Sequence, residues 1–259
     1  MRKKLSLLAL ALFLAMPAAA SPLRVGATPV PAAEILEFAA PLLKEREKVD
    51  LEVVEFTDFV TPNVALEDGD LHANMYQHLP YLANYNKGHG DNLRALESVY
   101  IVPMGIYSKK LKKLSALPKG ALVALPSDPT NGGRALLLLE LQGIIKLEKG
   151  AGLAATEMDI AENPLGLSFK AMEAAQLPRA LADVDMAVIN GNYALQAGLR
   201  PLEDSLLLEG GASPYAVHVV IRASDPVSPE VEALQRILRS DEVKKFITEK
   251  YKGGAIAAF

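Results

Sequence analysis

Residues 121–139 read ALVALPSDPTNGGRALLLL, and they carry the clearest local structural signals in this 259-residue chain. Ala121–Leu125 is a short apolar run, which is typical of a buried strand. Asp128 can cap the free amides of a helix that begins at Pro129, because proline suits the first turn. The apolar residues 135–139 continue this helix. The stretch therefore predicts a strand followed directly by a helix, the repeating unit of α/β folds.

The same alternation extends in both directions along the chain. Strands are expected at residues 23–28, 51–56, 70–76, 167–172, 185–190 and 215–221. Helices are expected at residues 34–46, 62–66, 78–85 and 174–181, and in pieces over 228–251 with a break near Ser240. Alternating strands and helices predict mainly parallel sheets with helices on their faces.

The length and the order of these elements predict two lobes. Lobe 1 is expected to combine residues 21–107 with residues 204–259, and lobe 2 to be an insertion of residues 108–203. A ligand would then lie between the lobes, where the carboxyl ends of parallel strands and the starts of helices converge.

Residues 1–20 predict a secretory signal peptide that is cleaved after Ala20. Positive charge at Arg2, Lys3 and Lys4 precedes the apolar run Leu5–Met16, and small residues follow it. This run is shorter than the roughly 20 apolar residues that a membrane-spanning helix needs. An uncleaved anchor and a buried core helix are the two alternatives.

The composition of the remaining 239 residues excludes several classes of protein. They carry 24 basic and 31 acidic residues, a net charge of −7 that disfavours nucleic acid or an anionic membrane as partner. The chain has no cysteine, which excludes disulfides, thiolate metal sites, cysteine nucleophiles and lipid attachment through cysteine.

No familiar catalytic signature is present in the sequence. It lacks the Gly-x-Ser-x-Gly, His-Glu-x-x-His and phosphate-loop patterns. The histidines show no i, i+4 pairing on a helix and lie in no carboxylate cluster, so neither a metal nor another cofactor is expected. They are His72, His78, His89 and His218.

Two segments are candidates for ligand contact. In Ser127–Arg134, two glycines could let an anionic ligand approach unpaired helix amides, and the guanidinium of Arg134 could hold a carboxylate by two parallel hydrogen bonds. The alternative is an ordinary helix start with a solvated arginine. In Asn74–Tyr81, aromatic rings and polar tips could surround an apolar ligand side chain, or could simply pack in the core.

At these residues the chain resembles the NlpA family of substrate-binding lipoproteins, best known for the methionine-binding components of ABC importers. The resemblance runs from LRVGAT at Leu23 to the C-terminal helices. It includes EFTDFVTPNVAL, ANMYQHLPYL, PSDPTNGGRALLLLELQGIIKL, MDIAENP and EAAQLPRALADVDMAVINGNYALQAGL. It implies a type II-like periplasmic binding protein, with two α/β lobes that close on a free amino acid and do no chemistry on it.

The resemblance also implies the ligand-binding residues. Arg134 would pair with the ligand carboxylate, and Asn190 would bind the charged backbone end of the ligand. The walls of the side-chain pocket would be Phe59, Tyr76, His78 and Tyr81. The implied partners are a membrane ABC permease and its ATPase, and a monomer is expected.

Two departures from the family pattern affect the expected function. Family members are commonly lipidated on a cysteine. This chain has no cysteine, so it is expected to diffuse freely in the periplasm. Methionine binders typically place an asparagine two positions beyond the tyrosine that corresponds to Tyr215, where this chain has Val217. The leading ligand is methionine, L- or D-, and the alternatives are another amino acid or a methionine-containing dipeptide. A secreted hydrolase and a sensor without ligand are the rival functions.

Overall fold

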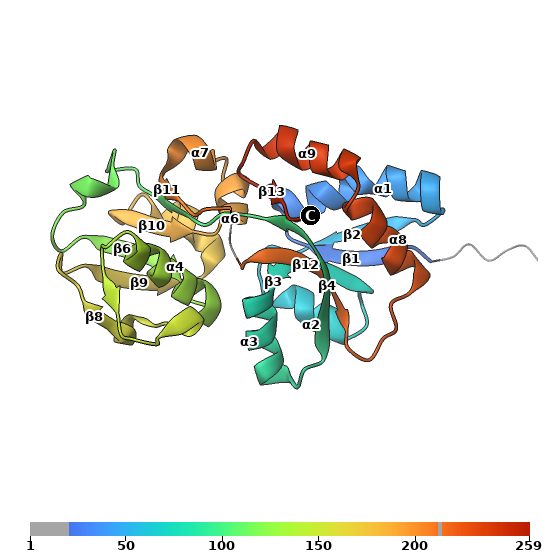
Figure 1. Ribbon diagram of the computed structural model, residues 1–259, viewed down its shortest axis with the longest axis horizontal. Coiled ribbons are helices and arrows are strands. Elements are labelled where there is room, and N and C mark those ends of the chain that lie inside the picture. Colours follow the sequence, from blue (N-terminus) through green and yellow to red (C-terminus); the bar gives the residue numbers. More distant parts are fainter. Residues whose placement is uncertain (1–20, 212–213) are drawn as a thin grey trace, which may run out of the picture.

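The strands and helices of this chain assemble into two lobes that lie side by side (Figure 1). The computed structural model describes residues 21–211 and 214–259, so the predicted signal peptide lies outside the described residues. In each lobe a mixed β-sheet is covered by helices on both faces. Within the described ranges, no helix is both long enough and apolar enough to cross a membrane.

Lobe 1 is built on a six-stranded sheet of order β13-β4-β12-β3-β1-β2. Its strands are β1 (Leu23–Ala27), β2 (Leu51–Glu55), β3 (Ala73–His78), β4 (Leu93–Ile101), β12 (Ala216–Arg222) and β13 (Ile256–Ala257). Its helices are α1 (Glu34–Glu47), α2 (Thr61–Glu67), α3 (Leu79–His89), α8 (Pro229–Leu238) and α9 (Asp241–Tyr251). The break expected near Ser240 is confirmed, because its side chain accepts a hydrogen bond from Val243 N and caps α9.

Lobe 2 is built on a five-stranded sheet of order β11-β5-β10-β6-β9 and a small pair, β7 with β8. Its strands are β5 (Gly105–Tyr107), β6 (Leu122–Pro126), β7 (Lys146–Leu147), β8 (Ile160–Glu162), β9 (Ser168–Met172), β10 (Met186–Ile189) and β11 (Ser205–Leu208). Its helices are α4 (Pro129–Leu141), α5 (Leu177–Ala180), α6 (Gly191–Gln196) and α7 (Pro201–Asp204).

The strand pairing differs from the predicted organisation in two respects. The sheets are mixed and not mainly parallel: β1 pairs in parallel with β2 and β3, whereas β12 runs antiparallel to both β3 and β4. Strands β5 and β11 pair in the sheet of lobe 2, although the predicted boundaries at 107/108 and 203/204 placed them in lobe 1. Both strands are short, and antiparallel pairing of β5 with β10 and β11 decides their place in lobe 2.

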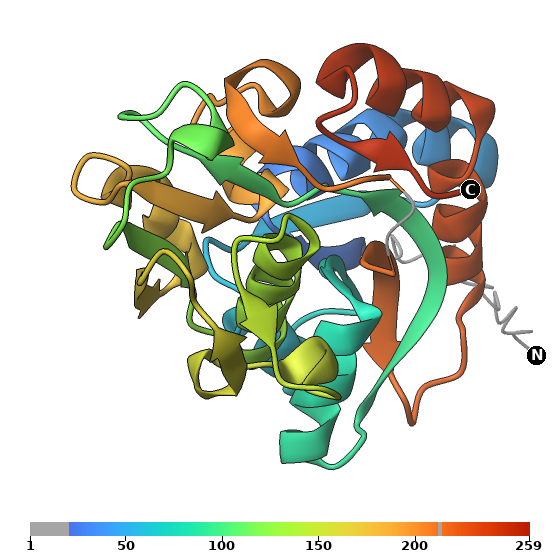
Figure 2. The ribbon, with the colours of Figure 1, turned by 60° about the vertical axis from the view of Figure 1, so that its left-hand side comes forward.

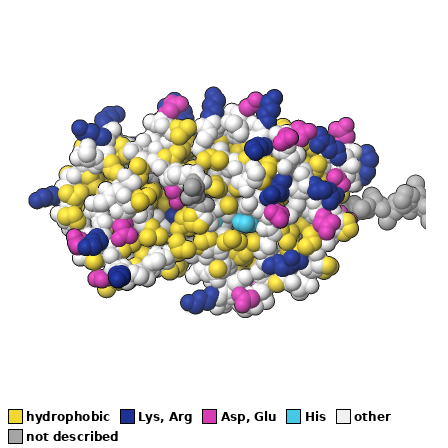
Figure 3. All heavy atoms as spheres, in the orientation of Figure 1, with side chains coloured by type: hydrophobic (Ala, Val, Ile, Leu, Met, Phe, Trp, Pro, Cys, Tyr) yellow, Lys and Arg dark blue, Asp and Glu magenta, His cyan; other side chains and the backbone are white. Residues whose placement is uncertain are grey.

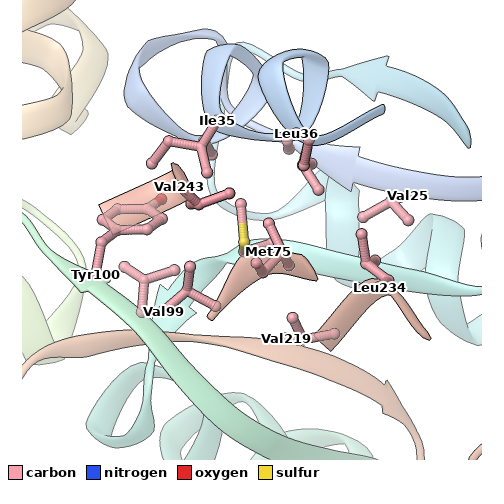
Figure 4. Close-up of a cluster of buried hydrophobic side chains, with 14 of the residues drawn as sticks. Val25, Ile35, Leu36, Met75, Val99, Tyr100, Val219, Leu234 and Val243 are labelled. Carbon is pink, nitrogen blue, oxygen red and sulfur yellow. The ribbon is translucent and has the colours of Figure 1, made fainter. Parts of the chain in front are cut away.

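The main core of lobe 1 lies between the sheet and helices α1, α8 and α9 (Figure 4). Val25 and Met75 from neighbouring strands meet Ile35 of α1 and Leu234 of α8 there. A second cluster under α2 and α3 covers the opposite face of the sheet. Because both faces of the sheet are covered, all six residues of the inner strand β3 are buried.

Alternation along single strands fills both faces of the lobe 2 sheet. Val123 of β6 packs in the cluster that includes Leu136 of α4, whereas the next residue, Ala124, packs in the cluster of α5 and α6. This period of two fixes the faces of the strand. Helix α4 is therefore anchored along its apolar side, and its first turn is held at the edge of the sheet that faces lobe 1.

The chain passes between the two sheets twice. The first crossing segment, residues 102–104, joins β4 to β5, and the second crossing segment begins at Glu209 after β11 and leads to β12. Helix α3 of lobe 1 lies against helix α4 of lobe 2 (Figures 1 and 2). On the face drawn in Figure 3, acidic and basic side chains are interspersed and form no large patch of one sign.

Candidate ligand-binding site

One cavity between the lobes brings together all six residues that the sequence singled out. About 450 Å³ of space not filled by protein atoms lies there, part of it open to solvent. The cavity is lined by Phe59, Tyr76, Gln77, His78, Tyr81, Tyr100, Val102, Asn131, Arg134, Asn190, Gly191, Asn192, Tyr215 and Val217. The carboxyl ends of β3 and β10 and the first turns of α3, α4 and α6 position most of these side chains.

One wall of the cavity is aromatic. The ring of Phe59 lies 6.0 Å from those of both Tyr76 and Tyr81, measured between centroids, and 4.9 Å from that of Tyr193. The hydroxyls of Tyr76 and Tyr81 both donate to the backbone oxygen of Phe59, at 2.8 and 2.7 Å. These two donors are therefore engaged by the protein itself, and the rings present an apolar, polarisable surface to the cavity.

A chain of hydrogen bonds from Asp128 orients the polar wall. Both carboxylate oxygens of Asp128 accept from Nδ2 of Asn131, each at 2.9 Å. A carboxylate that accepts from two directions fixes the amide orientation, so Oδ1 of Asn131 must act as an acceptor. This oxygen accepts a hydrogen bond from Nδ2 of Asn190 at 2.7 Å and lies 3.2 Å from Nε2 of His78.

These hydrogen bonds leave the side-chain oxygen of Asn190 without a donor among the described residues. Its Nδ2 is used on Asn131, whereas its Oδ1 has no hydrogen-bond partner among the described residues. The side chain is buried, with only 5% of the residue surface exposed. A buried acceptor without a donor is unfavourable, so Asn190 Oδ1 is a natural contact for a ligand N–H group.

His78 is held as the neutral tautomer that carries its proton on Nε2. Its Nδ1 accepts from Tyr81 N at 3.1 Å, as the N-cap of α3, which leaves Nε2 to donate to Asn131. Burial is the main cause and the nearby charge of Arg134 the second cause that lower the pKa of His78 to about 3. The imidazole therefore adds no charge to the cavity at neutral pH.

Arg134 supplies the positive charge of the cavity, but it already has a partner. Its Nε donates to Oε1 of Glu209 at 3.1 Å, and its Nη2 donates to Oε2 of Glu209 and, at 3.2 Å, to Val102 O. The guanidinium also lies over the ring of Tyr215, 4.1 Å from its centroid. The solvated arginine considered from sequence is therefore wrong, since Arg134 is buried and contacts both crossing segments.

The helix start at α4 is not the open anion seat that the sequence suggested. Asn131 N donates to Asp128 Oδ1 at 2.9 Å, so the protein's own carboxylate caps the helix. The two glycines serve packing: a Cβ on Gly132 would lie 2.9 Å from Pro126 O, and one on Gly133 would lie 2.3 Å from Leu153 O. Neither glycine lines the cavity.

Val217 lies where the sequence predicted a departure from the family pattern. It is buried, pairs with His78 across β12 and β3, and lines the cavity with an apolar side chain. His218 points elsewhere and places Nδ1 2.8 Å from Leu96 O. This agrees with the alternation of side chains along a strand.

Several cavity residues were not singled out from the sequence. Asn131 lies within Ser127–Arg134 and Asn192 lies two positions after Asn190, but no local pattern indicates that either side chain lines the cavity. Glu209 is 75 positions from Arg134, so no local pattern joins them. Across residues 21–211 and 214–259 there is no group of three or more His, Asp or Glu side chains that could hold a metal ion.

The chain is similar to known proteins over most of its length. A family model described as NlpA lipoprotein matches residues 23–259. The D-methionine-binding lipoprotein MetQ of Escherichia coli K12 is 42% identical over 225 residues, which cover 86% of this chain and 83% of MetQ.

Two solved structures extend this similarity to three dimensions. A nutrient-binding protein from Burkholderia cenocepacia bound to methionine has 48% sequence identity and a TM-score of 0.89, covering 92% of this chain and 100% of that one. A periplasmic substrate-binding protein of an ABC transporter from Coxiella burnetii has 43% identity and a TM-score of 0.88, covering 91% and 100%. The predicted two-lobed α/β fold is confirmed.

Proposed function

Because the chain belongs to the NlpA lipoprotein family, we propose that it is the substrate-binding protein of an ABC importer and that it captures free methionine. Its relatives support this proposal, since one is a D-methionine-binding lipoprotein and another was solved with methionine bound. The partners would be a membrane permease and its ATPase, and no cofactor is required.

The cavity has complementary groups for each part of an amino-acid zwitterion. The aromatic wall of Phe59, Tyr76 and Tyr81 would surround the thioether, because sulfur packs favourably against ring edges and faces. Arg134 would hold the carboxylate by a charge-assisted hydrogen bond. His78 would contribute the face of a neutral ring beside them.

One observation carries the proposal: Asn190 Oδ1 is a buried acceptor with no donor among the described residues, in a cavity that also contains a buried arginine. An ammonium group would satisfy this acceptor. The Arg134–Glu209 pair is close to neutral overall and His78 is uncharged, so the cavity favours a ligand without net charge. A zwitterion meets both conditions.

The arrangement of His78 supports binding over hydrolysis. Both of its ring nitrogens are engaged, Nδ1 by Tyr81 N and Nε2 by Asn131 Oδ1, so neither offers a lone pair to a substrate. Burial also keeps its pKa far below the operating range of a general base at neutral pH. Asp128 and Glu162 are the other candidates of the rival hydrolase hypothesis. Asp128 uses its carboxylate to cap α4 and to orient Asn131, and Glu162 pairs with Lys146 on the surface.

The proposed location rests on the sequence signals. We propose that residues 1–20 direct export, that the protein works as a monomer in the periplasm, and that it is not anchored through a lipidated cysteine, since the chain contains none. Lobe boundaries within residues 102–104 and shortly after Glu209 are proposed from the strand pairing.

Native mass spectrometry of the purified protein, before and after unfolding, tests the ligand. A bound mass equal to methionine is expected. A methionine-containing dipeptide is the alternative, because Val217 offers no hydrogen bond to a free ammonium group. A dipeptide mass would keep the transport role and change the ligand, whereas a protein that carries and binds neither would contradict the proposal.

A further inference from the structure

Asn192 is a second cavity-lining amide with an unused polar atom. Its Nδ2 has no hydrogen-bond partner in the part of the chain that the structure describes, and only 9% of the residue surface is exposed. The backbone of Gly191 sets its position: a Cβ on that glycine would lie 2.4 Å from Pro103 O, so α6 begins directly against the first crossing segment.

The other three cavity-lining amides already use their nitrogen atoms in hydrogen bonds within the protein. Nε2 of Gln77 donates to Asn63 and Asn74, at 2.6 and 3.0 Å. Nδ2 of Asn131 is used on Asp128, and Nδ2 of Asn190 is used on Asn131. Of the four amides that line the cavity, Asn192 is the one whose nitrogen has no hydrogen-bond partner among the described residues, so both of its N–H groups are available to a ligand.

Arg134 has only one nitrogen, Nη1, that is free of hydrogen bonds to Glu209 and Val102. A guanidinium has five N–H groups, and Glu209 and Val102 O already use those on Nε and Nη2. The free nitrogen, Nη1, can bind one carboxylate oxygen, but the two-nitrogen fork toward Glu209 is occupied. The second oxygen of a ligand carboxylate then needs a donor from another residue.

We propose that Asn192 is this residue: its Nδ2 donates to the ligand carboxylate opposite Arg134, while Asn190 Oδ1 accepts from the ammonium group. The inference rests on the proposed function and assigns a further specificity-determining residue to the same cavity. Two asparagines separated by one glycine would thus bind the two charged groups of the amino acid, Asn192 as donor to the carboxylate and Asn190 as acceptor from the ammonium group.

The test is calorimetric titration of L-methionine into the wild type, Asn192→Ala and Asn192→Asp, each stripped of ligand by unfolding and refolding. Asn192→Ala should weaken binding about tenfold or more through the lost hydrogen bond. Asn192→Asp has the same shape but replaces the donor with an anionic acceptor that repels the carboxylate. It should bind more weakly than Asn192→Ala, and it should recover affinity as the pH falls and the introduced aspartate gains a proton.

The control is Asn84→Asp, which adds the same charge on the exposed side of α3 and should bind like the wild type. Melting temperatures of all variants separate lost binding from lost folding. Unchanged affinity in Asn192→Ala would overturn the inference, and so would tighter binding by Asn192→Asp, which would place the ammonium group at Asn192. A wild type that binds no free amino acid would instead overturn the proposed function.

Discussion

The Nε2 atom of His78 lies 3.2 Å from Oδ1 of Asn131, and this hydrogen bond joins the N-cap of α3 in lobe 1 to the first turn of α4 in lobe 2. A second link runs from the hydroxyl of Tyr193 in lobe 2 to Thr57 O in lobe 1, at 3.2 Å. Both bonds join the two lobes, so the structure corresponds to lobes that are closed on the site. Opening the cavity to admit a ligand has to break them.

Methionine should therefore shift the protein from an open to a closed population, because the ligand contacts both lobes only when they are closed. Small-angle X-ray scattering of the stripped protein should show a smaller radius of gyration at saturating methionine. Asn131→Ala, which removes the link to His78, should close less at the same ligand concentration. Superimposable curves with and without ligand would count against this mechanism.

Arg134→Ala should weaken methionine binding by about 10- to 100-fold or more, because it removes a charge-assisted hydrogen bond in a buried site. Isothermal titration calorimetry measures this change. Arg179→Ala is the matched control, since this arginine is exposed on lobe 2 and does not line the cavity. Equal affinities of Arg134→Ala and the control would remove the assignment of the carboxylate to Arg134.

Glu209→Ala should lower the free energy of unfolding by about 3 to 5 kcal/mol, because it leaves the guanidinium of Arg134 buried without its counter-charge. The side chains of this pair are only 5% and 15% exposed, whereas those of Arg200 and Glu203 are 65% and 62% exposed. Glu203→Ala should therefore leave stability almost unchanged. Urea denaturation of both variants gives the comparison, and equal effects would mean that the buried pair is not a stability element.

His78 should make the stability of the protein depend on pH. Its pKa is about 3 in the folded state against an ordinary value of 6.5, chiefly because burial disfavours the imidazolium. Between these values the unfolded chain binds a proton that the folded chain does not, so acid favours unfolding. The contribution is complete above pH 6.5 and is lost as the pH falls toward 3, by at most about 1.4 kcal/mol per pH unit.

The comparison of wild type with His78→Gln isolates this effect from the titration of other groups. From about pH 7 to about pH 5, the wild type should lose more unfolding free energy than the variant, which has no imidazole to protonate. Denaturant midpoints across this range provide the measurement. Parallel pH profiles would show that His78 is not buried as described.

Local signals predicted the local structure well. Asp128 caps α4 and Pro129 occupies its first turn, as the sequence indicated, and Ser240 separates α8 from α9. The family blocks placed Arg134 and Asn190 beside the same cavity as the aromatic residues. These features depend on neighbours in the chain or on motifs of known spacing.

Long-range relationships could not be predicted. The free backbone amides at the start of α4 were expected to face a ligand. Whether Asp128 accepts a hydrogen bond from them instead depends on the rotamer of its own side chain. The partners of Asn131 lie 53 and 59 positions away, and the partner of Arg134 lies 75 positions away. Strand β5 is only three residues long, and its place in lobe 2 depends on antiparallel pairing with β10 and β11.

The cavity between the lobes is proposed to bind a free amino acid, with methionine as its ligand. Calorimetric titration of L-methionine into the stripped wild-type protein measures this binding. Saturable binding of one methionine per chain is expected. Absence of any binding to a protein that is folded by circular dichroism, under conditions where it binds another molecule one to one, would contradict it.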